Sequence, residues 1–380
     1  TEKEFKDLID SSHKNGVKLV IDGVFNHTGS GFFAFQDLIK NQENSKYKDW
    51  YFVKGWPVIK DGKPMNYEAW WGFGELPKLN VANPDTRKYI QDMVRKWGKL
   101  GIDGWRLDVA NEITDPTFWK EFRQIVRGIN PQGYIVGEIW DNAAAWLKGD
   151  QFDSVMNYRF RSACVEFFAG YSRHKDDALN ESLKQVVDTH SMFWQQKVSE
   201  FKTSITAEDF DRILGKIRID YPDEAHSVML NLLDSHDRYR FIMLFPDTLE
   251  PYKLAVFFQM TYPGTPCIYY GSEVGMEGGR DPDCRRAMPW DKSQWNMDIF
   301  EHYKKMTAMR NNHSALRAGD YYTVYAKGKQ YAFVREDAKE KVLVMLNNSQ
   351  EGARVPVSWK GAMTNFQLKP FEGRIEVVTK

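Results

Sequence analysis

Segments with helical spacing of apolar residues alternate with short apolar runs along most of this 380-residue chain. Such alternation is typical of a parallel sheet whose strands are joined by crossover helices. The sequence therefore predicts an α/β fold, with six strands that each follow a helical segment. The expected strands are 17–21, 104–109, 134–137, 152–156, 228–233 and 267–270, and the clearest helices are 1–16, 84–99, 116–127, 143–147 and 251–260.

From about Gly319 the apolar period changes from helical to two, which is typical of antiparallel strands. We expect such strands at 322–325, 331–334, 341–346 and 374–378. The predicted domains are therefore a partial β/α barrel at 1–318 and a C-terminal β-sandwich domain at 319–380. A stretch at 27–80 is too long for an ordinary loop and forms an insertion in the barrel. A second polar stretch, at 171–203, is also predicted to be an insertion, without assigned chemistry.

Charge and cysteine content exclude several classes of protein. The 52 basic and 52 acidic residues cancel, which argues against nucleic acid or an anionic membrane as a partner. No apolar run approaches the ~18 residues that a membrane span requires. Three cysteines without a CxxC pair argue against a disulfide scaffold and favour a reducing compartment, so we expect a cytoplasmic protein.

Polar side chains follow four of the predicted strands at the point where each strand ends. They include His27, the pair Arg106 and Asp108, Glu138, and the pair His236 and Asp237. A β/α barrel carries its active site at the carboxyl ends of its strands. We therefore expect these groups around one mouth, although any one of them alone is more often a helix cap or a hydrogen-bonded structural group.

Paired carboxylates of this kind suit glycoside hydrolysis, in which one is an ionised nucleophile and the other a protonated acid. Strand alternation places Asp108 on the same side as Arg106, whose guanidinium favours the ionised carboxylate. Glu138 precedes Ile139 and Trp140, and an apolar setting there would raise its pKa. We expect a gap of about 5 Å between the two carboxyl groups, as in retaining enzymes.

Four segments, GVKLVIDGVFNH, GIDGWRLDVANE, VGEIW and NLLDSHD, resemble the signature segments of the alpha-amylase family of glycoside hydrolases. Leu76–Asn80 and Asp281–Arg286 resemble its neopullulanase, cyclomaltodextrinase and maltogenic amylase group. The resemblance implies a (β/α)8 TIM barrel that here lacks its first two strands. It also implies a retaining hydrolase of α-1,4 and some α-1,6 glucosidic bonds in cyclodextrins, pullulan, starch or maltooligosaccharides, with transfer to sugars as a second outcome.

The resemblance also implies roles for single residues. Asp108 is the implied nucleophile, Glu138 the general acid/base and Asp237 the carboxylate that stabilises the transition state. The implied substrate-binding residues are His27, Arg106, Glu112, Trp140, His236, Asp281 and Arg285. No second ligand accompanies His236 at metal spacing. Many calcium-binding relatives hold the ion at the position of Asn26, but the subgroup that this sequence resembles often places calcium elsewhere, so we assign no metal and no cofactor, and calcium stays open.

Two expectations concern the chain as a whole. Because two barrel strands are missing, we expect a fragment of a longer polypeptide, weakly active or inactive in isolation, whose relatives dimerise through an N-terminal domain. The non-enzymatic alternative is an inactive, truncated glucan-binding protein on the same scaffold. A related glucosidase or isomerase is the other enzymatic alternative. The segments Leu76–Asn80 and Asp281–Arg286 argue against it.

Tryptophans are frequent in the long loop, at positions 50, 56, 70 and 71. They either line a cleft for sugar stacking or pack the loop onto the barrel, and packing is the commoner use of such residues.

Overall fold

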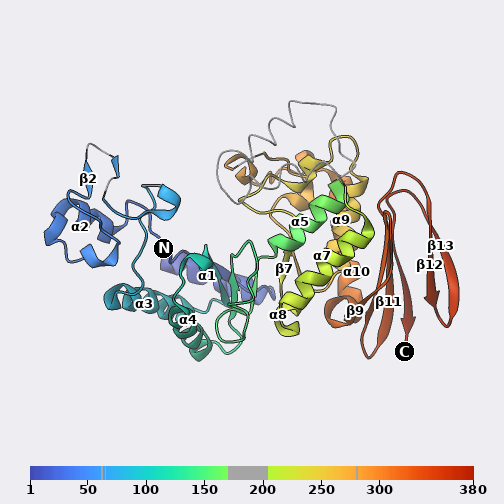
Figure 1. The fold of residues 1–380 in the computed structure, drawn as a ribbon, viewed down its shortest axis with the longest axis horizontal. Helices are drawn as coiled ribbons and strands as arrows, with labels where there is room; N and C mark the ends of the chain where they lie inside the picture. Colours follow the sequence, from blue (N-terminus) through green and yellow to red (C-terminus); the bar gives the residue numbers. More distant parts are fainter. Residues whose placement is uncertain (61–62, 65, 170–203, 280) are drawn as a thin grey trace. The chain divides into compact units, whose positions relative to one another are not determined.

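The computed structural model describes residues 1–60, 63–64, 66–169, 204–279 and 281–380 (Figure 1). The insertion predicted at 171–203 lies outside the described residues. The chain forms two compact units, Thr1–Met156 and Asn157–Lys380. The predicted domain boundary at 318/319 follows a change of strand pattern, and it stays a prediction.

The first unit contains a four-stranded parallel sheet in the order β1-β4-β5-β6. Because all four strands are parallel, their carboxyl ends lie at one edge, and the residues that follow them gather there. The register pairs Asp22 with Arg106 and Leu107 with Gly137. The strands are β1 (Val20–Gly23), β4 (Gly104–Leu107), β5 (Tyr134–Gly137) and β6 (Ser154–Val155).

Helices α1 (Glu2–Lys14), α3 (Pro84–Leu100) and α4 (Pro116–Ile129) belong to the same unit. The side chain of Asn83 accepts hydrogen bonds from the first N–H groups of α3, and Asp115 does the same for α4. Proline follows each cap, where its missing N–H costs nothing. The apolar faces of α3 and α4 are buried, which sets both helices against the sheet.

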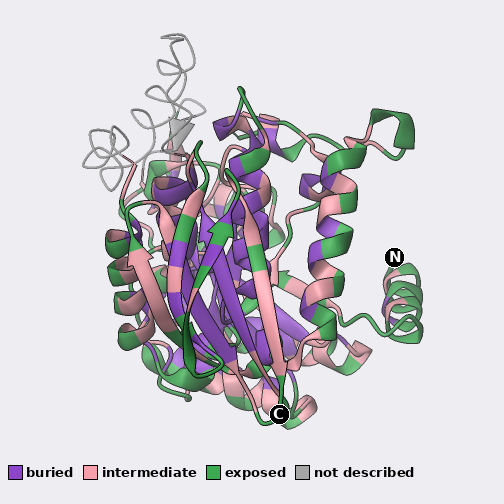
Figure 2. Ribbon diagram, turned by 90° about the vertical axis from the view of Figure 1, so that its right-hand side faces the viewer, coloured by how far each residue is buried: buried purple, intermediate pink, exposed green. Residues whose placement is uncertain are grey.

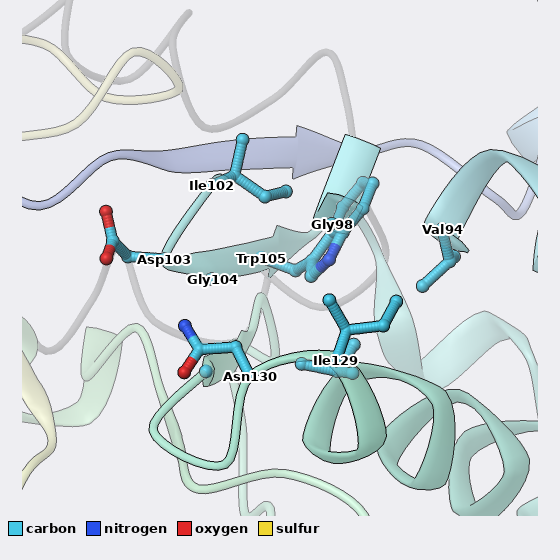
Figure 3. A pocket seen from close by; sticks show the side chains of 10 residues that line it. Val94, Gly98, Ile102, Asp103, Gly104, Trp105, Ile129 and Asn130 are labelled. Atoms are coloured by element: carbon cyan, nitrogen blue, oxygen red, sulfur yellow. The ribbon is translucent and has the colours of Figure 1, made fainter. Parts of the chain in front are cut away.

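A small gap of about 10 Å³ remains between α3, α4 and the start of β4, and Figure 3 shows the side chains around it. It has room for about one water molecule. Gly104 and Asp103 line it at the amino end of β4, whereas Asp108 follows the carboxyl end of that strand. We therefore interpret this gap as a packing defect of the core and not as a ligand site.

The long loop after β1 has structure of its own. It contains α2 (Phe33–Asn41), the short pair β2 (Ile59–Lys60) and β3 (Lys63–Pro64), and several 3-10 turns. Isolated antiparallel bridges join His27 to Lys78 and Tyr51 to Leu79. The loop therefore begins and ends beside the sheet edge that carries the candidate residues.

The second unit contains the parallel pair β7 (Leu230–Leu232) and β8 (Thr265–Cys267). The neighbouring helix α9 is mostly apolar, and ten of its twelve residues are buried, including the polar Gln259 and Thr261. A helix that is buried on nearly all sides forms the centre of a core. The helices are α5 (Tyr158–Phe168), α7 (Ala207–Asp220), α8 (Asp223–Ser227), α9 (Glu250–Thr261), α10 (Met297–Asn312) and α11 (Ser314–Ala318).

The C-terminal part of this unit is an antiparallel sheet in the order β14-β11-β10-β9, with a separate hairpin β12–β13. Buried residues fill the central strands and the edge strands are more exposed (Figure 2). One face contributes Tyr331, Phe333 and Val344 to the core around α9, and the other packs on the hairpin. The strands are β9 (Asp320–Lys327), β10 (Gln330–Glu336), β11 (Glu340–Asn347), β12 (Ala353–Trp359), β13 (Ala362–Leu368) and β14 (Gly373–Thr379).

All six strands predicted for the barrel are present, with ends that differ by a few residues, and so are the four predicted C-terminal strands. The predicted short helix at 143–147 was wrong, because that segment is a run of turns. Strands β12 and β13 were not anticipated. None of the helices in the described part of the chain combines the length and the apolar character needed to cross a bilayer.

Candidate active site

The guanidinium of Arg106, on β4, lies at the centre of the polar residues in the first unit. Its Nη1 donates to Asp108 Oδ1 at 2.8 Å and to Asp22 Oδ1 at 2.9 Å, and its Nη2 lies 2.9 Å from Glu138 Oε1. Burial alone would lower the pKa of Arg106, but the carboxylates of Glu138, Asp22 and Asp108 raise it. One permanent cation therefore holds three carboxylates from three neighbouring strands.

Glu138 follows β5 directly and is only 3% exposed. Its Oε2 accepts a hydrogen bond from the backbone N–H of Val109 at 3.0 Å, and its Oε1 accepts from Trp140 Nε1 at 3.2 Å. The sequence predicted an apolar setting for this carboxyl group. Instead, two N–H donors and the Arg106 guanidinium contact it.

His27 lies beside Asp108, with 3.9 Å between its Nε2 and Asp108 Oδ2. Burial lowers the pKa of His27, and the nearby Asp108 carboxylate raises it only in part. The imidazole is therefore mainly neutral near pH 7 and keeps one N–H to donate. Its ring stacks on Trp70, with centroids 5.3 Å apart, which fixes its orientation.

Glu112 lies one short turn beyond Asp108, on the 3-10 helix Ala110–Glu112. Its carboxylate is 3.5 Å from the ammonium group of Lys78. Both residues line a hollow of about 380 Å³, which lies within the volume range of small-ligand sites. The other lining residues are Lys54, Tyr67, Glu68, Ala69, Trp70, Trp71 and Gly72.

In the second unit, Asp237 follows β7 and is the centre of a second polar cluster. Its Oδ2 lies 3.2 Å from His236 Nε2 and accepts a hydrogen bond from the Tyr158 hydroxyl at 3.4 Å. Its Oδ1 is 3.2 Å from Arg285 Nη2. The same guanidinium pairs through Nε with Asp281 Oδ1 at 2.7 Å. These contacts hold Asp237 between an aromatic hydroxyl and a cation.

The buried carboxylate of Asp234 holds the segment that carries His236 and Asp237 in place. Asp234 Oδ2 accepts from Ser272 Oγ at 2.7 Å, and its Oδ1 accepts from the backbone N–H of Phe241. Burial raises the pKa of Asp234 despite these donors. Arg240 donates to the carbonyl of Tyr270 at 2.8 Å. The segment that carries His236 and Asp237 is thus tied at both ends to the turn after β8.

Asn26 is the residue whose position the family resemblance links to calcium. Its side chain is fully buried, and its Oδ1 has no hydrogen-bond partner among the described residues. A carbonyl oxygen is a suitable calcium ligand, but calcium needs six to eight oxygens. The described residues contain no group of three or more acidic, histidine or cysteine side chains placed to hold a metal ion. Calcium at Asn26 therefore stays a prediction.

The predicted residues thus form two groups, each inside one unit. His27, Arg106, Asp108, Glu138 and Trp140 come together in the first unit, with Glu112 one turn away. His236, Asp237, Asp281 and Arg285 come together in the second. That all of them surround one mouth stays a prediction.

The sequence did not suggest roles for Asp22 or Tyr158, and it placed Trp70 among four tryptophans that either line a cleft or pack the long loop. Asp22 was visible at a strand end, and strand pairing places it opposite Arg106. Tyr158 is far from Asp237 along the chain, and no spacing signal pointed to it.

Comparisons with known proteins identify the family of this chain. Residues 1–319 match the family model described as "Alpha amylase, catalytic domain". The chain belongs to the alpha-amylase family. This membership confirms the resemblance seen in the four signature segments, and the predicted fold class is confirmed with it.

Three similar proteins show how far the likeness of this alpha-amylase family chain extends. Neopullulanase 2 of Thermoactinomyces vulgaris is 40% identical over 99% of this chain and 60% of its own length. A cyclomaltodextrinase of Thermoanaerobacter pseudethanolicus is 42% identical over 91% of this chain and 55% of its own length. The crystal structure of a debranching enzyme from Nostoc punctiforme matches 98% of this chain and 78% of its own, with a TM-score of 0.88 and 35% identity. The chain therefore spans little more than half the length of these two sequence relatives.

Proposed function

We propose that the protein is a retaining α-glucan hydrolase of the cyclomaltodextrinase and neopullulanase type. Its substrates would be cyclodextrins, pullulan, starch or maltooligosaccharides, cleaved at α-1,4 and some α-1,6 bonds. The observation that carries the proposal is that Asp108 and Glu138, at the carboxyl ends of paired strands, share one guanidinium. Two carboxyl groups at close range are what a retaining mechanism requires. The names of the similar proteins support the substrate class.

In the first step, Asp108 attacks the anomeric carbon and forms a covalent glycosyl ester. The bond from that carbon to the glycosidic oxygen breaks, and Glu138 gives its proton to this oxygen. Arg106 donates to Asp108 Oδ1 and thereby orients the nucleophile. The neutral His27 donates its remaining N–H to a hydroxyl of the sugar being cleaved.

In the second step, the ionised Glu138 takes a proton from water, and the water oxygen attacks the anomeric carbon and releases Asp108. The N–H groups of Val109 and Trp140 stabilise the ionised Glu138 during this step. A sugar hydroxyl in place of water gives transglycosylation instead of hydrolysis. Asp237, held by Tyr158 and Arg285, would bind hydroxyls of the distorted sugar.

Hydrolysis of β-cyclodextrin, pullulan and starch by the wild type, two active-site variants and one control variant tests the proposal. Asp108→Asn and Glu138→Gln should each lower kcat by at least ~10³-fold, because nucleophile and acid act in the rate-determining steps. Glu43→Gln, an exposed residue outside both polar clusters, is the matched control and should keep wild-type rates. Proton NMR should detect the α-anomer as the first product.

Three results would contradict the proposal. A β-anomer as first product would exclude the retaining mechanism. Full activity of Glu138→Gln would remove Glu138 as the acid. Binding of maltooligosaccharides with no turnover of any substrate by the wild type would favour the glucan-binding alternative.

We also propose that the protein acts in the cytoplasm. All three cysteines are free, and burial raises the thiol pKa of Cys164. Free thiols are typical of reducing compartments. Fractionation of cells of the source organism tests this proposal, and recovery of the protein outside the cytoplasm would contradict it.

A further inference from the structure

Trp71 is placed in a way that costs the fold stability. Its backbone has a φ of 47°, in the left-handed region that residues with a side chain rarely adopt. The residue is 55% exposed, so a large apolar surface stays in contact with water. Strained backbone and exposed aromatic surface each weaken a fold, and strained residues cluster at functional sites. Their coincidence at one residue points to a use for this indole.

Trp71 is the outer member of a stack of three rings. Its indole lies parallel to that of Trp70, with centroids 4.8 Å apart and planes at 16°. Trp70 in turn stacks on His27, at 5.3 Å and 19°. Since His27 lies beside Asp108, the stack runs from the proposed nucleophile outward to the exposed indole.

The hollow of about 380 Å³ that Trp70 and Trp71 line also has charged walls. Lys54 pairs with Glu68 at 3.3 Å, and Lys78 pairs with Glu112 at 3.5 Å. Ammonium groups donate hydrogen bonds and carboxylates accept them, so these pairs match the hydroxyl groups of a sugar. A flat aromatic surface matches the apolar face of a glucose ring. The combination suits a pyranose better than a purely apolar or a purely charged ligand.

The hollow is next to the proposed acid. Glu138 accepts a hydrogen bond from the N–H of Val109, and the carbonyl of Val109 accepts from the N–H of Glu112. Glu112 lines the hollow, so one short turn separates the proposed acid from its wall. Because the acid protonates the leaving oxygen, a hollow on the side of the acid is placed to receive the sugars beyond that oxygen.

We propose that Trp71 is a binding platform for an outer glucosyl residue on the leaving-group side of an α-glucan chain. This inference rests on the proposed function and adds to it a specificity residue. The stack of Trp70 and His27 supports the platform from behind, and the pairs Lys54–Glu68 and Lys78–Glu112 bind the hydroxyl groups. The site favours substrates long enough to reach it, and it also favours sugars as acceptors over water.

Steady-state kinetics of Trp71→Ala on a long and a short substrate tests the proposal. For maltohexaose, which reaches the platform, we expect KM to rise about ten-fold with kcat within about two-fold, which corresponds to ~1.4 kcal/mol of lost binding. For p-nitrophenyl α-glucoside, whose leaving group is too short, kcat/KM should stay within about two-fold. Trp71→Phe keeps a ring and should recover most of the affinity for maltohexaose.

Trp290→Ala is the matched control, because Trp290 is 81% exposed and does not line the hollow. It should leave both substrates unaffected. Unchanged kinetics of Trp71→Ala with maltohexaose would overturn the proposal. Equal losses on both substrates would also overturn it, because they indicate a structural role.

Calorimetric binding of maltohexaose separates a failure of this inference from a failure of the proposed function. If the wild type hydrolyses nothing, the proposed function fails, but binding that Trp71→Ala weakens about ten-fold would still support the platform. If the wild type hydrolyses maltohexaose and Trp71→Ala binds it equally well in the Glu138→Gln background, only the platform fails.

Discussion

Replacement of Arg106 by methionine removes the cation that three carboxylates share and keeps a side chain of similar length. Glu138 is 3% exposed, and the Asp108 side chain is 20% exposed, so neither carboxylate can recover full hydration. Loss of one partner from a buried ion pair typically costs ~3–5 kcal/mol. Glu138 keeps two N–H donors and Asp108 keeps some contact with water. We therefore expect Arg106→Met to lose about 3 kcal/mol of unfolding free energy.

Urea denaturation at pH 7 measures this loss. With a slope of ~3 kcal/mol per molar urea, the midpoint should fall by about 1 M. The activation free energy of hydrolysis should rise by more than the unfolding free energy falls, because the nucleophile loses its orienting donor.

Asp22→Asn is the matched control for the same guanidinium. The Asp22 side chain is 51% exposed, and exposed ion pairs contribute at most ~1 kcal/mol. Arg106→Met with wild-type stability would refute the view that this cation holds buried carboxylates. An Asp22→Asn variant as unstable as Arg106→Met would refute the view that the buried carboxylates depend on this cation more than the exposed one does.

Two further predictions concern stability. Burial lowers the pKa of His226 from 6.5 to about 4, so between these pH values the unfolded chain binds a proton that the folded chain does not. The unfolding free energy should therefore fall as the pH drops through this window, by up to about 3 kcal/mol (2.5 units at ~1.36 kcal/mol each). Urea denaturation at pH 7 and pH 4.5 measures this fall, which His226→Gln should lack. A Cβ at position 104 would lie 2.3 Å from the Tyr134 carbonyl oxygen, so Gly104→Ala should cost about 2 kcal/mol, whereas Gly128→Ala, with nothing within 4 Å, should not destabilise the protein. Equal acid lability of His226→Gln and wild type, or equal stability of the two glycine variants, would contradict these expectations.

Local patterns were enough to predict much of the fold. The apolar run Tyr134–Gly137 is a strand with the predicted ends, and alternation correctly placed Arg106 and Asp108 on one side of β4. Strand β12 was missed because Pro356 interrupts its pattern, and proline normally argues against a strand. It is tolerated because β12 pairs only with β13, so one side of β12 needs no N–H donors.

The environment of Glu138 could not be predicted from its neighbours in sequence. Ile139 and Trp140 suggested an apolar pocket, but two of the polar groups that contact Glu138 come from β4 and the turn after it. Trp140 itself contributes an N–H donor and not only an apolar face. The stack of Trp71, Trp70 and His27 was equally hidden, because its outer members lie more than 40 positions from His27.

The register of the parallel sheet explains how two such carboxylates reach one guanidinium. Strands β4 and β5 pair Leu107 with Gly137, and the N–H of Glu138 donates to the carbonyl of Leu107 at 2.8 Å. Asp108 and Glu138 therefore leave adjacent strands at the same level. That register depends on the close approach of Gly104 to Tyr134 at the opposite end of the strands. A side chain at Gly104 should thus disturb the carboxylates as well as the core, so Gly104→Ala should lower kcat even where the variant remains folded.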